Sequence, residues 1–177
     1  MRLEETALGS RRVFEGKIIN LRVDEVELPN GQRATREVVE HPGAVAIAAV
    51  TEEGEIVLVR QFRKPAGEVL LEIPAGKLDP GEEPLECARR ELAEETGITA
   101  SSLKPLLRYY TTPGFSNEVI HLFGAAGLKK GEAAPDKDEF LEVVFLPLRE
   151  ALDMVREGKI CDAKTIIGIL WAVQQGL

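Results

Sequence analysis

The chain has 177 residues, of which 44% are hydrophobic and 29% are charged, and its formal net charge at pH 7 is -8. These values are those of an ordinary globular protein about one domain long, so they exclude a disordered or fibrous chain. The negative charge disfavours nonspecific binding to nucleic acid or to an anionic membrane, since both depend on positive patches. A polyanionic substrate would therefore need cations to mediate its binding.

The expected cellular location follows from two further features. No stretch approaches the ~18 continuous apolar residues of a membrane span, and the charged start MRLEETALGSRR lacks the apolar core of a secretion signal. Cys87 and Cys161 are too few for a disulfide framework and are not spaced like metal ligands. We therefore expect a cytoplasmic protein with neither a membrane nor a nucleic acid as a partner.

The first part of the chain is predicted to form strands. Apolar residues alternate in RRVFEGKIINLRVDEVEL, PNGQ supplies a turn, and RATREVVEH follows. This pattern predicts a small meander over residues 1–42, followed by the main domain over residues 43–177. The runs AVAIAAV and IVLVRQF, joined by TEEGE, predict a buried hairpin at the centre of a sheet. The segment EVLLEIPAG predicts another strand, which stops at Pro74.

A helix is predicted from about Pro84 to Thr96, since Pro84 suits a first helical position and Gly97 suits a C-terminal cap. Further strands are predicted in PLLRYYTT, EVIHLFGAAGL and LEVVFLPL, and two helices in REALDMVREG and AKTIIGILWAVQQ. The polar segments between the strands, TPGFSN and KKGEAAPDKDE, are typical of loops, and the second has the composition of a mobile one.

The predicted helix carries an unusual group of acids. Its apolar stripe, which can dock on a sheet, consists of Leu85, Ala88 and Leu92. Beside it, Glu91, Glu94 and Glu95 share one arc of the surface, where like charges repel unless cations neutralise them. Such a group suits Mg²⁺, which prefers oxygen ligands, whereas Zn²⁺ usually recruits His or Cys. The alternative is a solvated acidic face balanced by Arg89 and Arg90.

The order of the whole segment resembles the signature of the Nudix hydrolases: a glycine, five residues, a glutamate, seven residues, then Arg-Glu-aliphatic-any-Glu-Glu-any-Gly-aliphatic. Every defined position is present, namely Gly76, Glu82, Arg90, Glu91, Leu92, Glu94, Glu95, Gly97 and Ile98. The resemblance implies an α/β (α+β) fold, a Nudix-type α/β/α sandwich with a mixed sheet, preceded by the small antiparallel N-terminal meander. It also implies hydrolysis of a nucleoside diphosphate linked to another group.

The resemblance also implies roles for individual residues. The metal ligands would be Glu91 and Glu95, with Glu94 close by and the carbonyl of Ala75 completing the site. Glu82 would pair with Arg90 and hold the loop against the helix. The cofactor would be two or more Mg²⁺ ions, for which Mn²⁺ could substitute, and their charge would offset the substrate diphosphate. The helix alone leaves the proton acceptor open among Glu82, Glu94 and a residue from a distant loop.

A second segment, YYTTPGFSNE, resembles the ADP-ribose pyrophosphatase subfamily, which is marked by a proline 16 residues beyond the last glycine of the signature. Counted from Gly97, that proline is Pro113. An ordinary turn at Pro113 and Gly114 is the alternative. RQFR, EIPAGKLDPGE and an acidic loop before the last strand also belong to the subfamily pattern. The resemblance implies hydrolysis of ADP-ribose to AMP and ribose 5-phosphate.

Substrate-binding residues follow from the same resemblance. Arg36 and Arg63 match positions that contact the diphosphate or the ribose, a task suited to the fixed donors of a guanidinium. Either arginine could instead form a local salt bridge. The subfamily uses its first strands for adenine-side contacts and for a homodimer, so Phe14 is a candidate stacking residue, with Pro113 and Gly114 as further candidates.

In the loop PDKDEFLEV, Glu139 best matches the catalytic glutamate of the subfamily, with Asp138 or Glu142 as the alternative. A mobile loop can deliver a base after the substrate binds. A solvated acidic loop without a catalytic role is the other interpretation.

Two other functions stay open at this point. The nearest is hydrolysis of other nucleoside diphosphate sugars, and the next is a nucleotide-sugar-binding module that keeps the Nudix fold without catalysis. The intact set Glu91, Glu94 and Glu95 argues against a pure binder, which would not require so many metal-collecting groups. A structural scaffold with a solvated acidic helix is the weakest interpretation.

Overall fold

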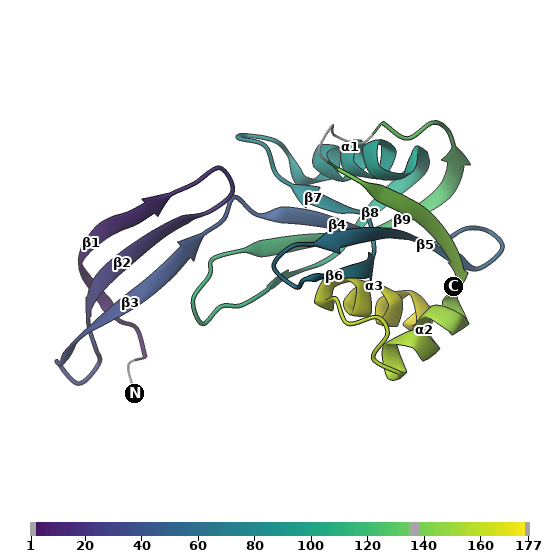
Figure 1. The fold of residues 1–177 in the computed structure, drawn as a ribbon. Coiled ribbons are helices and arrows are strands. Elements are labelled where there is room, and N and C mark those ends of the chain that lie inside the picture. The colour runs from purple at the N-terminus through teal and green to yellow at the C-terminus, as the bar shows by residue number, and fades with distance from the viewer. Residues whose placement is uncertain (1–2, 135–138, 176–177) are drawn as a thin grey trace. The chain divides into compact units, whose positions relative to one another are not determined.

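The computed structural model describes residues 3–134 and 139–175. The chain divides into two compact units (Figure 1). The first comprises residues 1–43 with 110–119, and the second comprises residues 44–109 with 120–177.

The first unit is a three-stranded antiparallel sheet formed by β1 (Thr6–Glu15), β2 (Asn20–Glu27) and β3 (Arg33–Glu40), in the order β1-β2-β3. The meander predicted from the sequence is therefore present. The β2–β3 turn is closed by a hydrogen bond of 2.8 Å from Gly31 N to Leu28 O, and Gly31 has a φ of 82°, which favours glycine. β1 begins earlier than the apolar alternation predicts.

Residues 110–119 belong to the same unit. Val39 N donates to Phe115 O at 2.7 Å, and Asn117 N donates back to Val39 O at 3.2 Å. Pro113 and Gly114 lie in a turn, which is closed by a hydrogen bond of 3.1 Å from Phe115 N to Thr112 O. The predicted loop TPGFSN is thus fastened to β3.

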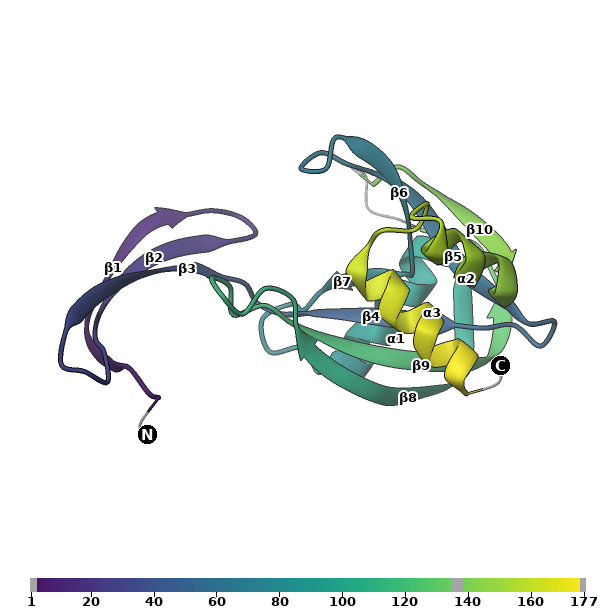
Figure 2. The same ribbon diagram turned by 90° about the horizontal axis from the view of Figure 1, so that it is seen from below.

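The second unit has two sheets between helices (Figures 1 and 2). One sheet has the order β7-β4-β9-β8, in which β4 (Ala44–Ala49) runs parallel to β9 (Val119–Lys130) and antiparallel to β7 (Ala75–Lys77). The other has the order β10-β5-β6 and consists of β5 (Glu55–Arg63), β6 (Glu68–Glu72) and β10 (Leu141–Pro147), all antiparallel. The predicted α/β class with a mixed sheet is confirmed.

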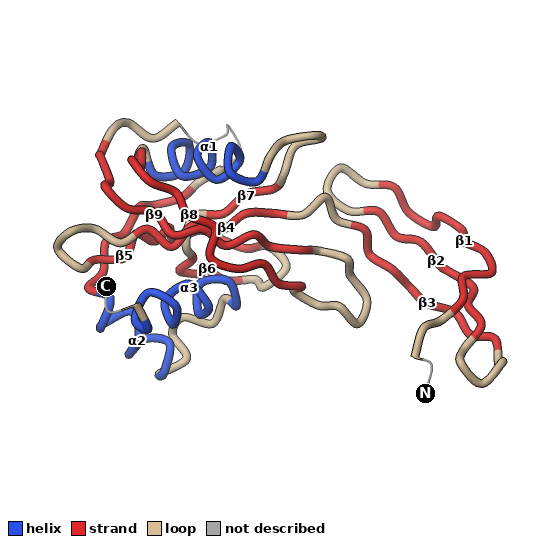
Figure 3. The backbone as a smooth tube through the Cα atoms, turned by 180° about the vertical axis from the view of Figure 1, so that it is seen from behind, coloured by secondary structure: helices blue, strands red, loops and turns tan. Residues whose placement is uncertain are grey.

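The helices cover the two faces of the layer of strands, as the tube view also shows (Figure 3). α1 (Pro84–Thr96) packs on one face, and α2 (Leu148–Arg156) and α3 (Ala163–Gln174) pack on the other. β4 explains the continuous apolar run of the sequence, because alternate residues enter opposite cores. Val45 and Ile47 face α1, whereas Ala44 and Ala46 face α2 and α3.

All three predicted helices are present. α1 spans Pro84–Thr96 as predicted, with Pro84 in its first turn and Gly97 as a left-handed cap at a φ of 69°. Its apolar stripe is buried as expected, with Ala88 and Leu92 in the core and Leu85 packed at its margin. No helix in the described part of the chain is long and apolar enough to cross a membrane.

The predicted central hairpin is wrong. A tight turn does join β4 to β5, with Thr51 N donating to Glu55 O at 2.8 Å, but after one bridge between Val50 and Ile56 the strands enter different sheets. Both strands are buried on two faces, so each takes its own neighbours: β7 and β9 for β4, and β6 and β10 for β5. Apolar runs and a turn signal predict two buried strands but do not specify their pairing.

Two strand boundaries also differ from the prediction. The strand predicted to stop at Pro74 is two strands, since β6 ends at Glu72 and β7 begins at Ala75. Pro74 has no N–H to donate to a ladder, so it suits the point where the chain leaves one sheet for the other. β8 (Ile98–Tyr110) begins directly after the helix cap, and it tolerates Pro105 because it is an edge strand.

Candidate active site

The loop before α1 is fastened to the helix by an ion pair. Arg90 donates from Nε to one carboxylate oxygen of Glu82 at 2.9 Å and from Nη2 to the other at 3.0 Å. Asp79 N donates to the same carboxylate at 3.0 Å. The Arg90 and Asp79 hydrogen bonds lower the pKa of Glu82 to about 2. This is the Glu82–Arg90 pairing that the sequence predicts, and it makes Glu82 a poor proton acceptor near neutral pH.

Glu91 is buried against the backbone of the segment before the loop. A Cβ atom on Gly76 would lie 1.8 Å from the carboxyl carbon of Glu91, so the first signature position must be glycine. Burial raises the pKa of Glu91, and the charges of Glu94 and Glu139 act in the same direction. Arg90 acts against the shift, since its Nη1 donates to Glu91 at 2.7 Å.

Glu95 is the most buried acid of the helix, with 2% of its surface exposed. Its carboxylate accepts a hydrogen bond of 3.0 Å from the N–H of Ala75, the first residue of β7. Burial raises its pKa to about 8, and the negative charges of Glu91 and Glu139 add to this effect. Glu95 is thus a buried carboxylate whose charge is poorly compensated.

The remaining acids of the prediction take different places. Glu94 is partly buried and accepts a hydrogen bond of 2.9 Å from Arg90 Nη1. The charge of Glu139, in the loop before β10, acts on both Glu91 and Glu95. Glu142 is an exposed residue of β10 that pairs with Arg60 at 2.9 Å. Asp138 lies outside the described residues.

The donor set suits a hard divalent cation. Glu91 and Glu95 offer carboxylate oxygens that burial and mutual repulsion hold at raised pKa values, a cost that a bound cation would relieve. Among residues 3–134 and 139–175, no three acidic, His or Cys groups already converge as a complete metal shell. Arg90 instead bonds to Glu91 and Glu94, so both would have to turn toward a cation.

The solvated acidic face suggested as an alternative exists only on the outer side of α1. There Glu86 and Arg89 are exposed and lie 3.6 Å apart. Glu91 and Glu95 do not belong to it because both are buried.

Arg63, at the end of β5, holds a buried glutamate. Its Nε and Nη2 donate to the two carboxylate oxygens of Glu72 at 2.8 and 2.9 Å. Lys164 of α3 also donates to Glu72. Sequence reasoning missed both Glu72 and Lys164. The available signal was a lone acid inside the apolar run VLLEIP, because a charge inside a buried strand needs a partner.

The other predicted substrate residues belong to the first unit, whereas α1 and Arg63 belong to the second. Phe14 is an exposed residue of β1. Arg36, on β3, pairs with Glu5 and donates to the carbonyl of Thr35 at 3.0 Å, which is the local salt bridge of the alternative interpretation. Pro113 and Gly114 form the turn described above.

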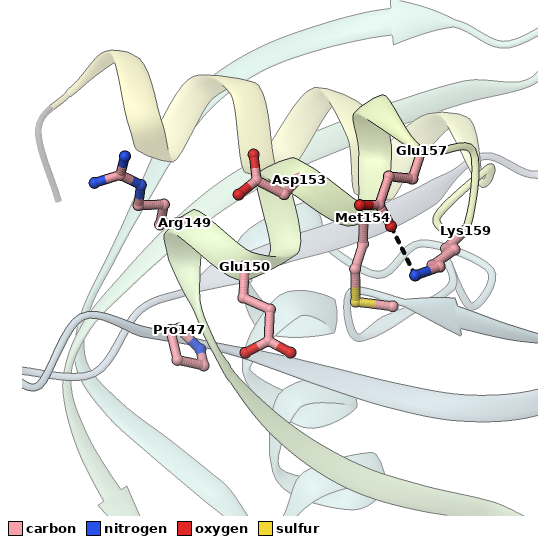
Figure 4. A pocket seen from close by; sticks show the side chains of 7 residues that line it. All are labelled: Pro147, Arg149, Glu150, Asp153, Met154, Glu157 and Lys159. Carbon is pink, nitrogen blue, oxygen red and sulfur yellow. Dashed lines mark ion pairs between the residues drawn. The ribbon is translucent and has the colours of Figure 1, made fainter.

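A hollow of about 620 Å³ lies elsewhere, on α2 and its flanking residues (Figure 4). It is lined by Pro147, Arg149, Glu150, Asp153, Met154, Glu157 and Lys159. Two of its acids are already paired, Glu157 with Lys159 at 2.7 Å and Asp153 with Arg156 at 2.9 Å. We therefore assign the chemistry to the buried acids of α1, whose pKa values are raised, rather than to this hollow.

Comparison with known families identifies the family of the chain. A family model described as the NUDIX domain matches residues 40–166, and one described as the nucleoside diphosphate sugar hydrolase N-terminal domain matches residues 5–39. The chain belongs to the Nudix family. The family predicted from the signature at Gly76 to Ile98 is therefore confirmed.

Individual relatives are similar along nearly the whole Nudix chain. An ADP-ribose pyrophosphatase of Bacillus subtilis (strain 168) is 50% identical over 169 residues, which cover 94% of this chain and 91% of the relative. A methanol dehydrogenase activator of Bacillus methanolicus is 48% identical over 168 residues, with the same coverage of 94% and 91%. A crystal structure of an ADP compounds hydrolase has the same fold, with a TM-score of 0.86, 24% identity, and coverage of 100% of this chain and 96% of that one.

Proposed function

We propose that the protein hydrolyses the diphosphate of ADP-ribose with a divalent cation and releases AMP and ribose 5-phosphate. The observation that carries the proposal is the pair of buried, poorly compensated carboxylates, Glu91 and Glu95, within a complete Nudix signature. The substrate is supported by the 50% identical relative named ADP-ribose pyrophosphatase.

We propose the following roles for the acids of α1 and for the segment before it. Glu91, Glu95 and Glu94 would hold the cations, with the carbonyl of Ala75 as a further oxygen donor. Bound divalent cations supply positive charge that offsets the diphosphate and the charge developing in the transition state. The Glu82–Arg90 pair keeps the loop and the helix in register. We propose two or more Mg²⁺ ions, replaceable by Mn²⁺.

The proton of the attacking water needs an acceptor outside the metal ligands. Hydrolysis forms one bond from the water oxygen to phosphorus and breaks the bond from phosphorus to the bridging oxygen, which leaves with the other phosphate. We propose Glu139, whose charge acts on Glu91 and Glu95, as this acceptor. Glu82 is held ionised by Arg90 and is a weak base, with a pKa of about 2.

Arg63 is the proposed contact to the substrate diphosphate from the second unit. Its guanidinium is partly exposed, and its charge acts on Glu95. A guanidinium with a fixed orientation suits a phosphate oxygen. From the first unit, Phe14 remains a proposed stacking residue on the adenine side and Arg36 a proposed contact to the diphosphate or the ribose. Pro113 and Gly114 remain further proposed substrate contacts.

The first unit also supports a proposal about assembly. All ten residues of β1 are exposed, and Val26 is the one hydrophobic side chain of the described part of this unit that is buried. Exposed apolar side chains include Val13, Phe14, Ile18 and Ile19. A three-stranded sheet that buries so few apolar side chains is stabilised when another protein surface packs against it. We propose a homodimer through this unit, and a fully active monomer at micromolar concentration in sedimentation would contradict it.

A panel of substrates tests the substrate assignment. The chain is incubated with Mg²⁺ and with ADP-ribose, GDP-mannose, UDP-glucose and other nucleoside diphosphate sugars, and the products are separated by chromatography. We expect the highest kcat/KM for ADP-ribose, because discrimination is a difference in transition-state stabilisation. Equal kcat/KM values across the panel would reject ADP-ribose as the preferred substrate and leave a general nucleoside diphosphate sugar hydrolase.

A second function is favoured by the 48% identical relative named methanol dehydrogenase activator. A chain acting only as a binding or activating module would bind ADP-ribose without releasing AMP. The same chromatography distinguishes the two functions, since product formation supports the hydrolase and binding without products supports the module. A cytoplasmic location stays a prediction of the sequence, to be tested by cell fractionation.

A further inference from the structure

A cluster of charged side chains at the start of α3 is joined to Arg63. Its centre is Glu72, which is 1% exposed and is bonded by Arg63 on one side and by Lys164 on the other. A carboxylate this deeply buried is costly unless it is fully compensated. Arg63 and Lys164 therefore share the buried carboxylate of Glu72. Of these two cations, only Arg63 is substantially exposed.

The cluster continues into the helix. Lys164 is itself almost buried and lies 3.1 Å from Oδ1 of Asp162. Asp162 caps α3, because its carboxylate accepts hydrogen bonds from Thr165 N at 3.0 Å and from Thr165 Oγ1 at 2.6 Å. An unbroken series of contacts thus runs from the helix cap through Lys164 and Glu72 to Arg63.

The same helix end also fixes the strand that leads to the acids of α1. Thr165 Oγ1 accepts a hydrogen bond of 2.9 Å from Ile73 N, directly after Glu72. Pro74 O accepts from Ile47 N at 2.8 Å, and Ala75 N donates to Glu95 at 3.0 Å. Residues 72–75 are therefore held at every position, with Arg63 attached to the first and Glu95 to the last.

The orientation of Arg63 follows from these contacts. Nε and Nη2 are both occupied by Glu72, and Nη1 makes no hydrogen bond within the part of the chain that the structure describes. Because a guanidinium is planar, fixing one edge of it sets the direction of the other. The side chain of Arg63 is 40% exposed, in contrast to 2% for Glu72 and 12% for Lys164. Arg63 is therefore the member of this charged cluster that a ligand can reach.

We propose that Lys164 and Glu72 are positioning residues that hold Arg63 in the orientation in which it binds the substrate diphosphate. The inference rests on the proposed function, since it takes Arg63 as a substrate contact. Lys164 shares the charge of Glu72 and fixes its carboxylate, so that Arg63 keeps both its direction and its positive charge for the substrate. A purely structural ion pair would instead affect stability alone.

The test replaces Lys164 by methionine, which keeps most of the side-chain length and removes the charge. Lys164→Met should raise KM for ADP-ribose by about 5- to 20-fold and change kcat by less than about twofold, the pattern of lost uniform binding. Lys164→Arg, which keeps the cation, should restore most of the loss. Lys159→Met is the matched control, because Lys159 is exposed and pairs only with Glu157 among the residues that the structure describes.

A double-mutant cycle with Arg63→Met shows whether Lys164 acts through the arginine. In the Arg63→Met background, Lys164→Met should raise KM little further, since its target is gone. Parental KM and kcat in Lys164→Met, with only a lower Tm, would overturn the proposal. Independent, multiplying effects of the two changes on KM would overturn it as well.

Two further outcomes are separable. If Lys164→Met does not fold, Lys164→Gln takes its place in the cycle, because it also removes the charge but keeps a hydrogen-bond donor for Glu72. If the parent chain prefers another nucleoside diphosphate sugar, the ADP-ribose assignment fails, and the KM comparison is made on that substrate. A KM effect that depends on Arg63 supports the positioning role on either substrate, and its absence refutes it.

Discussion

Glu72 and Glu95 are similarly buried glutamates of one unit, but their surroundings shift their pKa values in opposite directions. At Glu72, burial opposes ionisation, but Arg63 and Lys164 outweigh it and lower the pKa. At Glu95, burial together with the charges of Glu91 and Glu139 raises the pKa to about 8. The two acids are linked by a short stretch of backbone, because Ala75, whose N–H donates to Glu95, is only three positions after Glu72.

The difference between the two acids distinguishes a structural ion pair from a candidate metal site. Where the fold supplies two cations to a buried acid, as at Glu72, the acid is stable as an ion without any ligand. Where it gathers buried acids with raised pKa values, as at Glu91 and Glu95, positive charge from outside the chain favours their ionised forms. In the proposed function, divalent cations would supply that charge.

The largest expected effect follows from removing the charge of one buried acid of α1. Glu95→Gln and Glu91→Gln should each lower kcat for ADP-ribose by about 100-fold or more, because even an outer partner of a metal ligand is worth about 10- to 100-fold. Circular dichroism should show the parental fold. Hydrolysis at the parental rate, with the same dependence on Mg²⁺, would mean that the acids of α1 do not form the metal site.

The next effect concerns the proton acceptor. Glu139→Gln should lower kcat by about 100-fold, within the range of a lost general base, while KM and Mg²⁺ affinity change by less than about threefold, as for an interaction made in the transition state. Glu142→Gln is the control in the same region, since Glu142 pairs with Arg60. A large loss in the control but not in Glu139→Gln would show that the base has been assigned to the wrong residue.

Loss of the compensated acid beside the site should have a smaller effect. Glu82→Gln keeps one acceptor for Arg90 and removes the charge, so kcat should fall by about 10-fold, as for an outer partner of a metal ligand. Steady-state kinetics at saturating Mg²⁺ measures the change. A loss as large as that of Glu95→Gln would indicate that Glu82 acts directly on the reacting groups.

The smallest effect is on stability and distinguishes the two acids by pH. In the metal-free protein the folded-state pKa of Glu95 is raised to about 8 from 4.5, so the folded state loses stability as the pH rises from about 4.5 to 8. Glu72 has a lowered pKa, so its contribution is present above pH 4.5 and is lost only below it. The free energy of unfolding, measured with urea, should therefore decrease as the pH rises from 5 to 8.

The matched variants sharpen this test. Glu95→Gln should flatten the slope between pH 5 and 8, and the remainder should come from Glu91, whose pKa is also raised. Glu72→Gln should lower stability across the range and leave the slope unchanged. An unchanged slope in Glu95→Gln would show that Glu95 ionises normally in the folded protein.

The sequence predicted local features better than pairings between distant segments. The bounds of α1, its glycine cap and the Glu82–Arg90 pair depend on residues within 16 positions of one another, and each was predictable. The separation of β4 from β5 was not, because an apolar run shows burial but not the neighbouring strand. Glu72 and Lys164 are 92 positions apart in the sequence. The only sign of their contact in the sequence is a lone acid in an apolar strand.

Calorimetric titration of the metal-free protein with Mg²⁺ tests the central claim most directly. At pH 7, below the raised pKa of Glu95, Mg²⁺ binding should release protons, so the measured enthalpy should depend on the ionisation enthalpy of the buffer. Glu95→Gln should bind Mg²⁺ weakly and lose most of this dependence, whereas Glu142→Gln should match the parent. Parental affinity and proton release in Glu95→Gln would contradict a cation site built on the buried acids of α1.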